Sequence, residues 1–456
     1  MNISFENPDK VNGLMTITVE EADIKANVEK TLKEYRKKAN YPGFRPGMVP
    51  MGLIKKQFGT QVKMEAVNKF VGEQIYNYVK ENNIQMLGEP LPSEKQTPVD
   101  IEKDAPYTFI FDIAVAPEFK VELNGKNKID YYKIKADDEL IGKQLEMLQN
   151  RAGEYVKAET FDAAQNDMLK GDLRELDAEG NTKENGITVE GAVLMPQYIK
   201  VDEQKNLFNE AKLGDIITFN PRKAYPEGEA EIAALLKIDK EEAKNLTADF
   251  SYQVTEINRY QKAELGEAFY KKVFGDDTDV TTEEQCRAKI VESLAPQLEI
   301  NSDFKFLEDV KEYTESKVGE LTFPDALLKR IMLLNNKERG EEFVEKNYDA
   351  SVKQLKWHLI KEQLVKAHDI KVDDNDIKKA AKEASRMQFA QYGMDNVPEE
   401  YLDQYVDSLL KKRENIDSFV DRAVDAKLVN ALKASVKLNE KEVTLDEFNK
   451  LMEEKK

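Results

Sequence analysis

The residues best suited to binding chemistry lie in one short loop, from Tyr41 to Pro50, which reads YPGFRPGMVP and joins two amphipathic helical patterns. Its glycines permit tight turns and its prolines restrict the unfolded chain, so we expect an ordered, projecting tip. Phe44 offers an apolar anchor, and the Arg45 guanidinium can pair with a carboxylate or a phosphate. The chemistry predicted for this loop is therefore recognition of a partner.

Basic residues gather around the loop. Between Lys25 and Lys63 the chain carries ten lysines and arginines against two acids, Glu29 and Glu34, whereas the whole chain has a formal net charge of -19. A contact with a polyanion must therefore be local. The alternative is that Phe44 and Arg45 form an ordinary turn and that the cations are a solvated helix face. The cations are Lys25, Lys30, Lys33, Arg36, Lys37, Lys38, Arg45, Lys55, Lys56 and Lys63.

Composition excludes several classes of site. A single cysteine, Cys286, cannot form an internal disulfide, and two histidines cannot build a histidine-rich metal site with it. No metal or organic cofactor is implied. Residues 1–30 carry no uninterrupted apolar core after a basic start, and no later run approaches the roughly 20 apolar residues that span a bilayer. We expect a cytoplasmic protein without a membrane partner.

The chain has 456 residues, which is too long for a single hydrophobic core, so we expect several domains. Strand-like runs at Leu14–Val19 and Tyr107–Val115 enclose the two helical patterns. The predicted fold class is α+β, multidomain and elongated. The expected domains are an α+β domain at 1–115, a connector at 116–158, a small β-rich domain at 159–260 with strands near 172–176, 191–195, 215–219 and 249–257, and a large all-α domain at 261–456.

The last domain shows the clearest helical periodicity. Apolar residues recur every three or four positions from Glu399 to Lys433, which predicts one continuous helix. Pro324, Gly393 and Pro398 punctuate the series, as residues at helix boundaries do.

The loop resembles the ribosome-binding signature of the trigger factor family, Gly-Phe-Arg-x-Gly-x-x-Pro, which this chain meets at Gly43, Phe44, Arg45, Gly47 and Pro50. Three later stretches resemble the helical domain of that family in order and spacing. They are Leu321–Leu328, His368–Asp373 and Lys437–Thr444.

The resemblance implies a chaperone that works without ATP, docks at the exit tunnel of the large ribosomal subunit and shields nascent polypeptides. It implies contact with both protein and ribosomal RNA, and self-association when the chaperone is free. The family usually has lysines where this chain has Pro46 and Met48, so we expect weaker or less salt-sensitive docking. The ribosome-binding residues expected here are Lys37, Lys38, Gly43, Phe44, Arg45, Pro46 and Gly47.

Binding of clients must be passive, because the sequence has no Gly-rich phosphate loop followed by Lys-Ser/Thr. Methionines and tyrosines crowd near Gly393 and could adapt to many apolar segments. The alternative for each is packing between helices. The side chains expected to contact nascent chains are Met387, Phe389, Tyr392, Met394, Tyr401 and Tyr405, with Met332 as a further example.

The middle domain of the family resembles FKBP-type prolyl isomerases, whose pocket combines aromatic walls with a Val/Ile-Pro-Gly-aromatic segment. Here Gln197 replaces the glycine, and paired glycines are missing around Thr182–Val189. We expect a retained fold, weak or lost isomerase activity and no confidently assigned catalytic residue. The residues of this degenerate pocket are Pro196, Tyr198, Phe208, Phe219 and Tyr225, with Phe250 also considered, and the alternative is that the aromatics form the domain core.

Two other functions remain open from the sequence. In one, the middle domain is a working prolyl isomerase and the helical arms deliver its substrate. In the other, the chain is a free holdase or assembly scaffold that has lost ribosome contact, as the replacements at Pro46 and Met48 allow.

Overall fold

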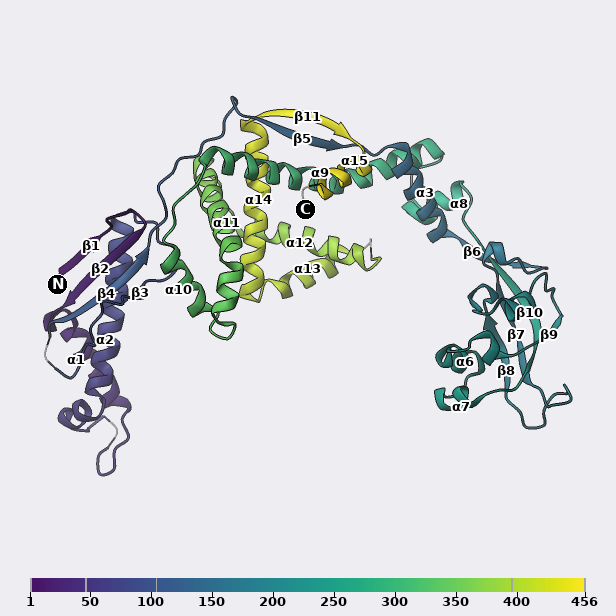
Figure 1. Ribbon diagram of the computed structural model, residues 1–456, viewed down its shortest axis with the longest axis horizontal. Helices are drawn as coiled ribbons and strands as arrows, with labels where there is room; N and C mark the ends of the chain where they lie inside the picture. Colours follow the sequence, from purple (N-terminus) through teal and green to yellow (C-terminus); the bar gives the residue numbers. More distant parts are fainter. Residues whose placement is uncertain (1, 46, 104, 395–396, 455–456) are drawn as a thin grey trace. The chain divides into compact units, whose positions relative to one another are not determined.

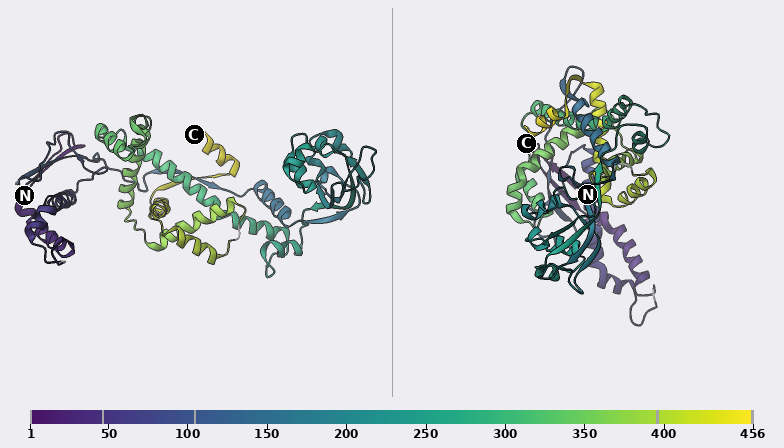
Figure 2. Two further views of the ribbon diagram at one scale, coloured as in Figure 1. Left: turned by 90° about the horizontal axis from the view of Figure 1, so that it is seen from below. Right: turned by 90° about the vertical axis from the view of Figure 1, so that its right-hand side faces the viewer.

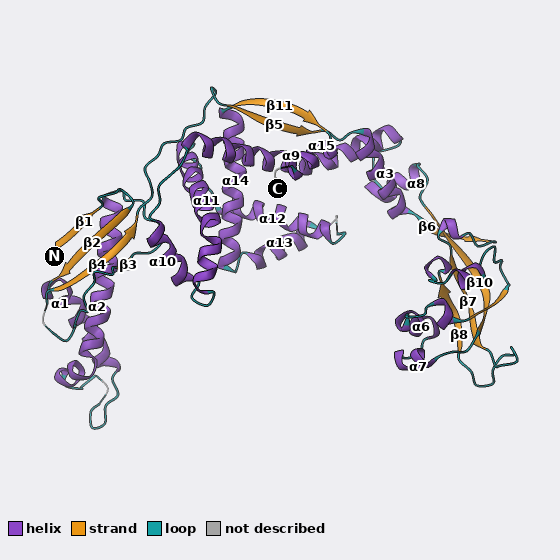
Figure 3. Ribbon diagram, viewed as in Figure 1, coloured by secondary structure: helices purple, strands orange, loops and turns teal. Residues whose placement is uncertain are grey.

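The chain forms two compact units in the computed structural model. Each unit contains a β-sheet, and the remaining elements are mainly helices (Figure 3). The described part of the chain contains no helix that is long and apolar enough to cross a membrane. The first unit comprises Met1–Tyr132 and Ser302–Lys441, and the second comprises Lys133–Asn301 and Glu442–Lys456. The structure describes residues 2–45, 47–103, 105–394 and 397–454.

A four-stranded antiparallel sheet opens the first unit, with strand order β1-β2-β4-β3. Met15, Ile17 and Val19 alternate along β2 and are fully buried, as a half-buried strand requires. They pack with Ile24 of α1 and Val67 of α2. The strands are β1 (Asn2–Glu6), β2 (Asn12–Val19), β3 (Leu91–Pro92) and β4 (Tyr107–Ala114), and the helices are α1 (Glu21–Lys38) and α2 (Met51–Glu81).

Helices α1 and α2 run side by side and continue past the sheet as an arm, with their connecting loop at the far end (Figure 1). The right-hand view of Figure 2 shows the same loop at the free end of the arm. Four buried side chains form a second, small core between the helices at this end: Leu32, Val49, Ile54 and Val62. The arm therefore has its own apolar support, separate from the sheet.

The rest of the first unit is a helical body. Its core brings together Phe306 of α9, Ile360 and Leu364 of α11, and Leu428 and Leu432 of α14, all fully buried. The helices are α9 (Glu283–Val318), which continues from the second unit, α10 (Asp325–Asn335), α11 (Gly340–Ala367), α12 (Asp374–Gln391), α13 (Glu399–Leu409) and α14 (Arg413–Ser435).

The prediction of one continuous helix from Glu399 to Lys433 is wrong, because α13 ends at Leu409 and α14 begins at Arg413. The Asn415 side chain donates a hydrogen bond to the Leu409 carbonyl at 3.0 Å, which satisfies one of the carbonyls left free at a helix end. The apolar spacing continues across the break, so periodicity alone does not show it.

A strand, β11 (Lys437–Val443), lies within the region expected to be helical and pairs with β5 (Lys128–Ile134). Its residues are exposed or half-buried, so the sequence has no strong alternating apolar pattern there.

Near this sheet the Tyr131 hydroxyl and the Lys433 ammonium each donate to the Asp303 carboxylate at 2.8 Å. Burial, and secondarily the bond to Asp303, raises the pKa of Tyr131 to about 12. The phenol therefore remains a hydrogen-bond donor at neutral pH.

The second unit is built on a five-stranded sheet in the order β6-β10-β7-β8, with β9 also paired to β10. Its core includes Leu169, Leu173, Phe250 and Tyr252, all fully buried. The four strands expected from sequence correspond to β7 to β10, with bounds that differ by one residue or more. The strands are β6 (Glu154–Ala158), β7 (Met168–Glu175), β8 (Thr188–Leu194), β9 (Ile216–Phe219) and β10 (Phe250–Gln261), and the short helices are α4 (Asp202–Asn206), α5 (Pro221–Ala224), α6 (Glu229–Leu236) and α7 (Lys240–Asn245).

A separate small core lies beside this sheet in the second unit. Ile141 and Leu145 of α3 pack with Phe269 of α8 and Ile290 of α9 around Cys286, which is fully buried. Burial raises the pKa of the Cys286 thiol, so it remains protonated and packs as a small apolar residue. The helices α3 (Asp138–Ala152) and α8 (Glu267–Phe274) contribute to this core, and the second unit also contains α15 (Leu445–Glu453).

The β7–β8 hairpin contains an acid-sensitive contact. Glu175 is buried and accepts hydrogen bonds from the Lys183 ammonium at 2.6 Å and the Ile187 amide at 2.9 Å. Burial alone would raise the pKa of Glu175, but these bonds outweigh it and hold that pKa below its usual value of 4.5. The contribution to stability is therefore complete above the unfolded-state pKa and is lost as pH falls through the folded-state pKa.

We expect Glu175→Gln to lower the free energy of unfolding by about 1 kcal/mol at pH 7, because the amide is uncharged. The difference from the native chain should shrink as pH falls below about 4.5. Urea unfolding at pH 7, 5 and 3.5 measures it. Glu184→Gln is the matched control, since Glu184 is an exposed acid in the same hairpin loop. A difference that does not change with pH would contradict this account.

Candidate functional site

The tip of the arm is built from two successive turns. The Phe44 amide donates to the Tyr41 carbonyl at 3.1 Å, and Gly43 has a φ of +87°. Pro42 and Gly43 thus occupy the two central positions of a turn that requires positive φ at its third residue. In the second turn the Met48 amide donates to the Arg45 carbonyl at 2.9 Å, and Gly47 has a φ of +82°. The predicted tip residue Pro46 lies outside the described residues.

The two turns leave the expected recognition residues open to solvent. The Phe44 side chain is 39% exposed, and its ring meets the Tyr41 ring edge-on at 6.4 Å between centroids. Arg45 is exposed as well. The tip therefore presents an aromatic ring beside a guanidinium, in a backbone held by local hydrogen bonds.

Lys37 and Lys38 lie exposed in the last turn of α1, where basic residues also suit the helix dipole. Among the described residues, no carboxylate forms an ion pair with Lys37, Lys38 or Arg45. Lys63, farther along α2, differs because it pairs with Glu21 at 3.6 Å. The tip is thus a basic surface whose cations are available to an anionic partner.

The predicted client-binding side chains lie on α12, on α13 and in the segment between them, of which residues 395–396 are outside the description. Four of the six are exposed: Met387 by 37%, Met394 by 48%, Tyr401 by 66% and Tyr392 by 73%. Phe389 and Tyr405 instead pack against each other at 5.1 Å between ring centroids and are half-buried. These two contribute to the seam between α12 and α13. Met332, on α10, is also half-buried.

Ion pairs hold α12 against α13. Lys382 lies 2.6 Å from Asp403, Lys378 lies 3.1 Å from Asp407, and Arg386 pairs with Glu399. These pairs join the two helices that carry the exposed methionines and tyrosines, although exposed pairs of this kind contribute little to stability.

The middle domain has a pocket of about 750 Å³ beside β8 and α6. Of the residues predicted for a degenerate isomerase pocket, it brings together Tyr198, which is 67% exposed, and the buried Tyr225. Burial, and secondarily the Glu231 carboxylate, raises the pKa of Tyr225 to about 12. The phenol can therefore donate a hydrogen bond at neutral pH. The sequence did not identify the lining residues Met195, Lys200, Glu231, Leu235 and Lys237. Glu231 and Leu235 lie on α6, and Lys237 directly follows that helix.

The other predicted pocket aromatics lie in the core. Phe208, Phe219 and Phe250 are essentially fully buried, and Phe208 packs edge-on against Phe219 at 5.3 Å and Tyr252 at 6.1 Å. Edge-on packing of this kind is typical of aromatic cores. These rings therefore support the sheet and do not line the pocket.

The Pro196 segment departs from an isomerase-like wall. Pro196 is buried at the start of a short 3₁₀ turn, Pro196–Tyr198. The amide nitrogen and oxygen of the Gln197 side chain are both buried and have no hydrogen-bond partner among the described residues. A glycine at this position would have no such group to bury. The glutamine thus adds a desolvation cost to this segment.

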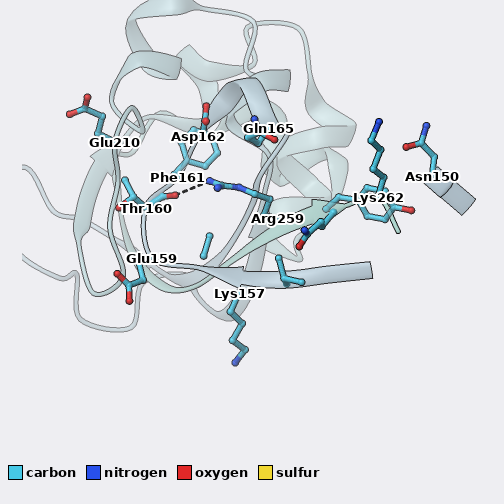
Figure 4. A pocket seen from close by; sticks show the side chains of 14 residues that line it. Asn150, Lys157, Glu159, Thr160, Phe161, Asp162, Gln165, Glu210, Arg259 and Lys262 are labelled. Atoms are coloured by element: carbon cyan, nitrogen blue, oxygen red, sulfur yellow. Dashed lines mark hydrogen bonds between the residues drawn. The ribbon is translucent and has the colours of Figure 1, made fainter. Parts of the chain in front are cut away.

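A larger cavity of about 1000 Å³ lies elsewhere in the second unit, near β6 and the end of β10, and none of the predicted pocket residues line it (Figure 4). Arg259 points into it but is already bound, with two 2.8 Å hydrogen bonds to the fully buried Asp167 and one of 3.2 Å to the Thr160 carbonyl. The described residues include no cluster of histidine, cysteine and acidic side chains that could hold a metal ion.

Comparison with known proteins matches three consecutive stretches of the chain to family models. A model described as "Bacterial trigger factor protein (TF)" matches residues 1–148, one for the FKBP-like domain of a probable trigger factor matches 155–262, and one for the C-terminal domain matches 302–452. A trigger factor from Chloroherpeton thalassium is 24% identical over 94% of this chain and 100% of its own length. One from Delftia acidovorans is 27% identical over 72% and 70%.

The fold agrees with these matches. A solved trigger factor chaperone, reported in a study of promiscuous substrate recognition in folding and assembly, aligns with a TM-score of 0.51 at 16% identity. The alignment covers 95% of this chain and 99% of that one. With three family models in consecutive order and full-length relatives, the chain belongs to the trigger factor family of molecular chaperones.

Proposed function

We propose that this chaperone docks at the exit tunnel of the large ribosomal subunit through the tip at residues 43–47 and shields nascent polypeptides without ATP. The observation that carries the proposal is the exposed Phe44 and Arg45 pair, held between two hydrogen-bonded turns. Phe44 supplies an apolar anchor, and Arg45 pairs with an acidic side chain of a ribosomal protein or a phosphate of ribosomal RNA. Lys37 and Lys38 add charge beside them.

The salt dependence of docking follows from the charges at the tip. Each phosphate neutralised by a lysine or arginine adds about one unit to the slope of log affinity against log salt. Because Pro46 and Met48 stand where the family usually has lysines, this chain has fewer cations to contribute. Docking should therefore rely more on the Phe44 anchor.

Clients bind to the exposed Met387, Tyr392, Met394 and Tyr401 on the α12–α13 pair. Methionine and tyrosine suit this role because they present large, adaptable contact surfaces without demanding one partner sequence. Release needs no fuel if each contact is weak. Phe389 and Tyr405 support the surface from below by packing against each other.

The middle domain serves as an additional lobe that contacts peptides, with prolyl isomerase activity weak or lost. Tyr198 and Tyr225 line its pocket, whereas the other aromatic residues expected there are buried in the core of the domain. Catalysis requires the enzyme to stabilise the twisted X-Pro bond more than the planar one. A pocket with few fixed walls therefore binds a peptide without accelerating isomerisation of its X-Pro bond.

The same proposal covers the organisation of the chain. The ribosome-binding domain occupies 1–115, the connector 116–158, the isomerase-like domain 159–260 and the helical chaperone domain 261–456. The protein acts in the cytoplasm, where nascent chains emerge, and associates with itself when it is not on the ribosome. It uses no cofactor.

The docking proposal is tested with the double variant Phe44→Ala/Arg45→Ala. We expect it to lose co-sedimentation with 70S ribosomes, because both the anchor and the charge are removed. The matched control is Tyr76→Ala/Lys80→Ala, which removes another exposed aromatic and cation pair, 5.9 Å apart, from α2. The control should bind as the native chain does. Native-level binding by both variants would refute docking through this tip, and no binding by the native chain would leave a free holdase as the better description.

The client surface is tested by changing Met387, Tyr392 and Tyr401 together to serine. Suppression of aggregation of a chemically unfolded client should fall severalfold, since about 1 kcal/mol or more of apolar contact is lost at each large side chain. A control with the same residue types changes Met64, Tyr76 and Tyr155, which are 47%, 66% and 55% exposed. Undiminished suppression by the first variant, with its fold intact by circular dichroism, refutes this surface.

Isomerase activity is measured by refolding of a client whose rate is limited by proline isomerisation, a step of tens of seconds or longer without catalysis. We expect the native chain to leave that rate nearly unchanged, while an active FKBP-type isomerase accelerates it in parallel. A clear acceleration that Tyr225→Phe abolishes would instead show a working enzyme in the middle domain.

A further inference from the structure

Arg36 makes a contact that distinguishes it from the other cations around the tip. Its Nε donates a hydrogen bond to the Val49 backbone carbonyl at 2.9 Å, across thirteen residues of sequence. Arg36 lies in the last turn of α1, and Val49 lies after the second turn of the tip, two residues before α2 begins. The bond therefore joins the two ends of the loop.

The Val49 carbonyl needs such a donor. The Val49 side chain is fully buried with Leu32, Ile54 and Val62, which keeps this stretch of backbone close to the arm. A carbonyl in such a setting costs free energy unless it is hydrogen-bonded. The amides of Leu53 and Ile54, at the start of α2, donate to the Pro50 carbonyl and so do not supply a donor to Val49. The side chain of Arg36 supplies the donor from the opposite helix.

We infer that Arg36 is a positioning residue for ribosome docking, and that its Nε–H donor matters more than its positive charge. It closes the base of the loop and so holds the two turns that present Phe44 and Arg45. Its neighbours Lys37 and Lys38 have no ion-pair partner in the described chain and remain available for an anionic surface. This inference rests on the proposed docking function of the tip.

Three substitutions separate the donor from the charge. In Arg36→Gln, the amide nitrogen Nε2 stands the same number of bonds from the backbone as Nε of arginine, so a donor is kept and the charge is lost. Arg36→Lys keeps the charge but carries a methylene group where the donor stood. Arg36→Met has similar length and supplies neither.

We expect ribosome affinity, measured by co-sedimentation at a fixed salt concentration, to stay within about twofold of native for Arg36→Gln. It should fall about fivefold for Arg36→Met and Arg36→Lys, the range expected from loss of one hydrogen bond to a buried carbonyl. The opposite order, with Arg36→Lys near native and Arg36→Gln weakened, would show that Arg36 acts through its charge and overturn the inference. Native affinity in all three variants would also overturn it.

A second measurement does not involve ribosomes. Hydrogen exchange of the free, full-length protein reports on the Phe44 and Met48 amides, whose hydrogen bonds close the two turns. Their exchange should become severalfold faster in Arg36→Met and Arg36→Lys but not in Arg36→Gln. Unchanged exchange in Arg36→Met would refute the positioning role. If exchange changes as expected but the native chain binds no ribosomes, the positioning role stands and the docking proposal fails.

Discussion

The arm depends on a buried apolar seam at its far end. Where two helices extend beyond a sheet, they cannot bury apolar side chains against it. Because an isolated helix pair is only marginally stable in water, its apolar contacts must come from the helices and the loop themselves. Leu32, Ile54 and Val62 provide the seam, and Val49 draws the returning loop into it. Tyr35 and Phe58 extend the contact, with ring centroids 5.2 Å apart. Without this seam the two turns would have no fixed base. Phe44 and Arg45 would then lose their conformational entropy on binding a partner and not on folding.

The sequence is informative wherever function requires particular residue types at fixed spacing. The tip is predictable because positive-φ glycines at 43 and 47 and the prolines beside them specify turns whatever surrounds them. The β2 strand is predictable because its apolar residues alternate with more exposed ones, as in a half-buried sheet. By contrast, Phe208 and Tyr198 are both aromatic residues in one small domain, yet the first is fully buried and the second is 67% exposed. The residue type alone does not predict whether a side chain lies on the buried or the exposed face of its helix or strand.

Contacts between residues that are distant in sequence account for other features that the sequence did not predict. The β11 strand depends on pairing with β5, more than 300 residues earlier, and this pairing leaves no local pattern in the sequence. Arg36 belongs to the same class: composition places it among ten cations around the tip, whereas its contact with Val49 depends on how closely α1 and α2 approach.

The two exposed surfaces solve opposite binding problems with similar means. In the proposed function the tip recognises one partner, and its backbone is held by turn hydrogen bonds and an apolar seam, so little entropy is lost on docking. In the same proposal many unrelated clients bind weakly to the α12–α13 pair, where ion pairs such as Lys382 with Asp403 join the helices and the exposed methionines and tyrosines keep their side-chain freedom. Ordering those side chains costs part of each client contact. That cost keeps binding reversible in a chaperone that spends no ATP.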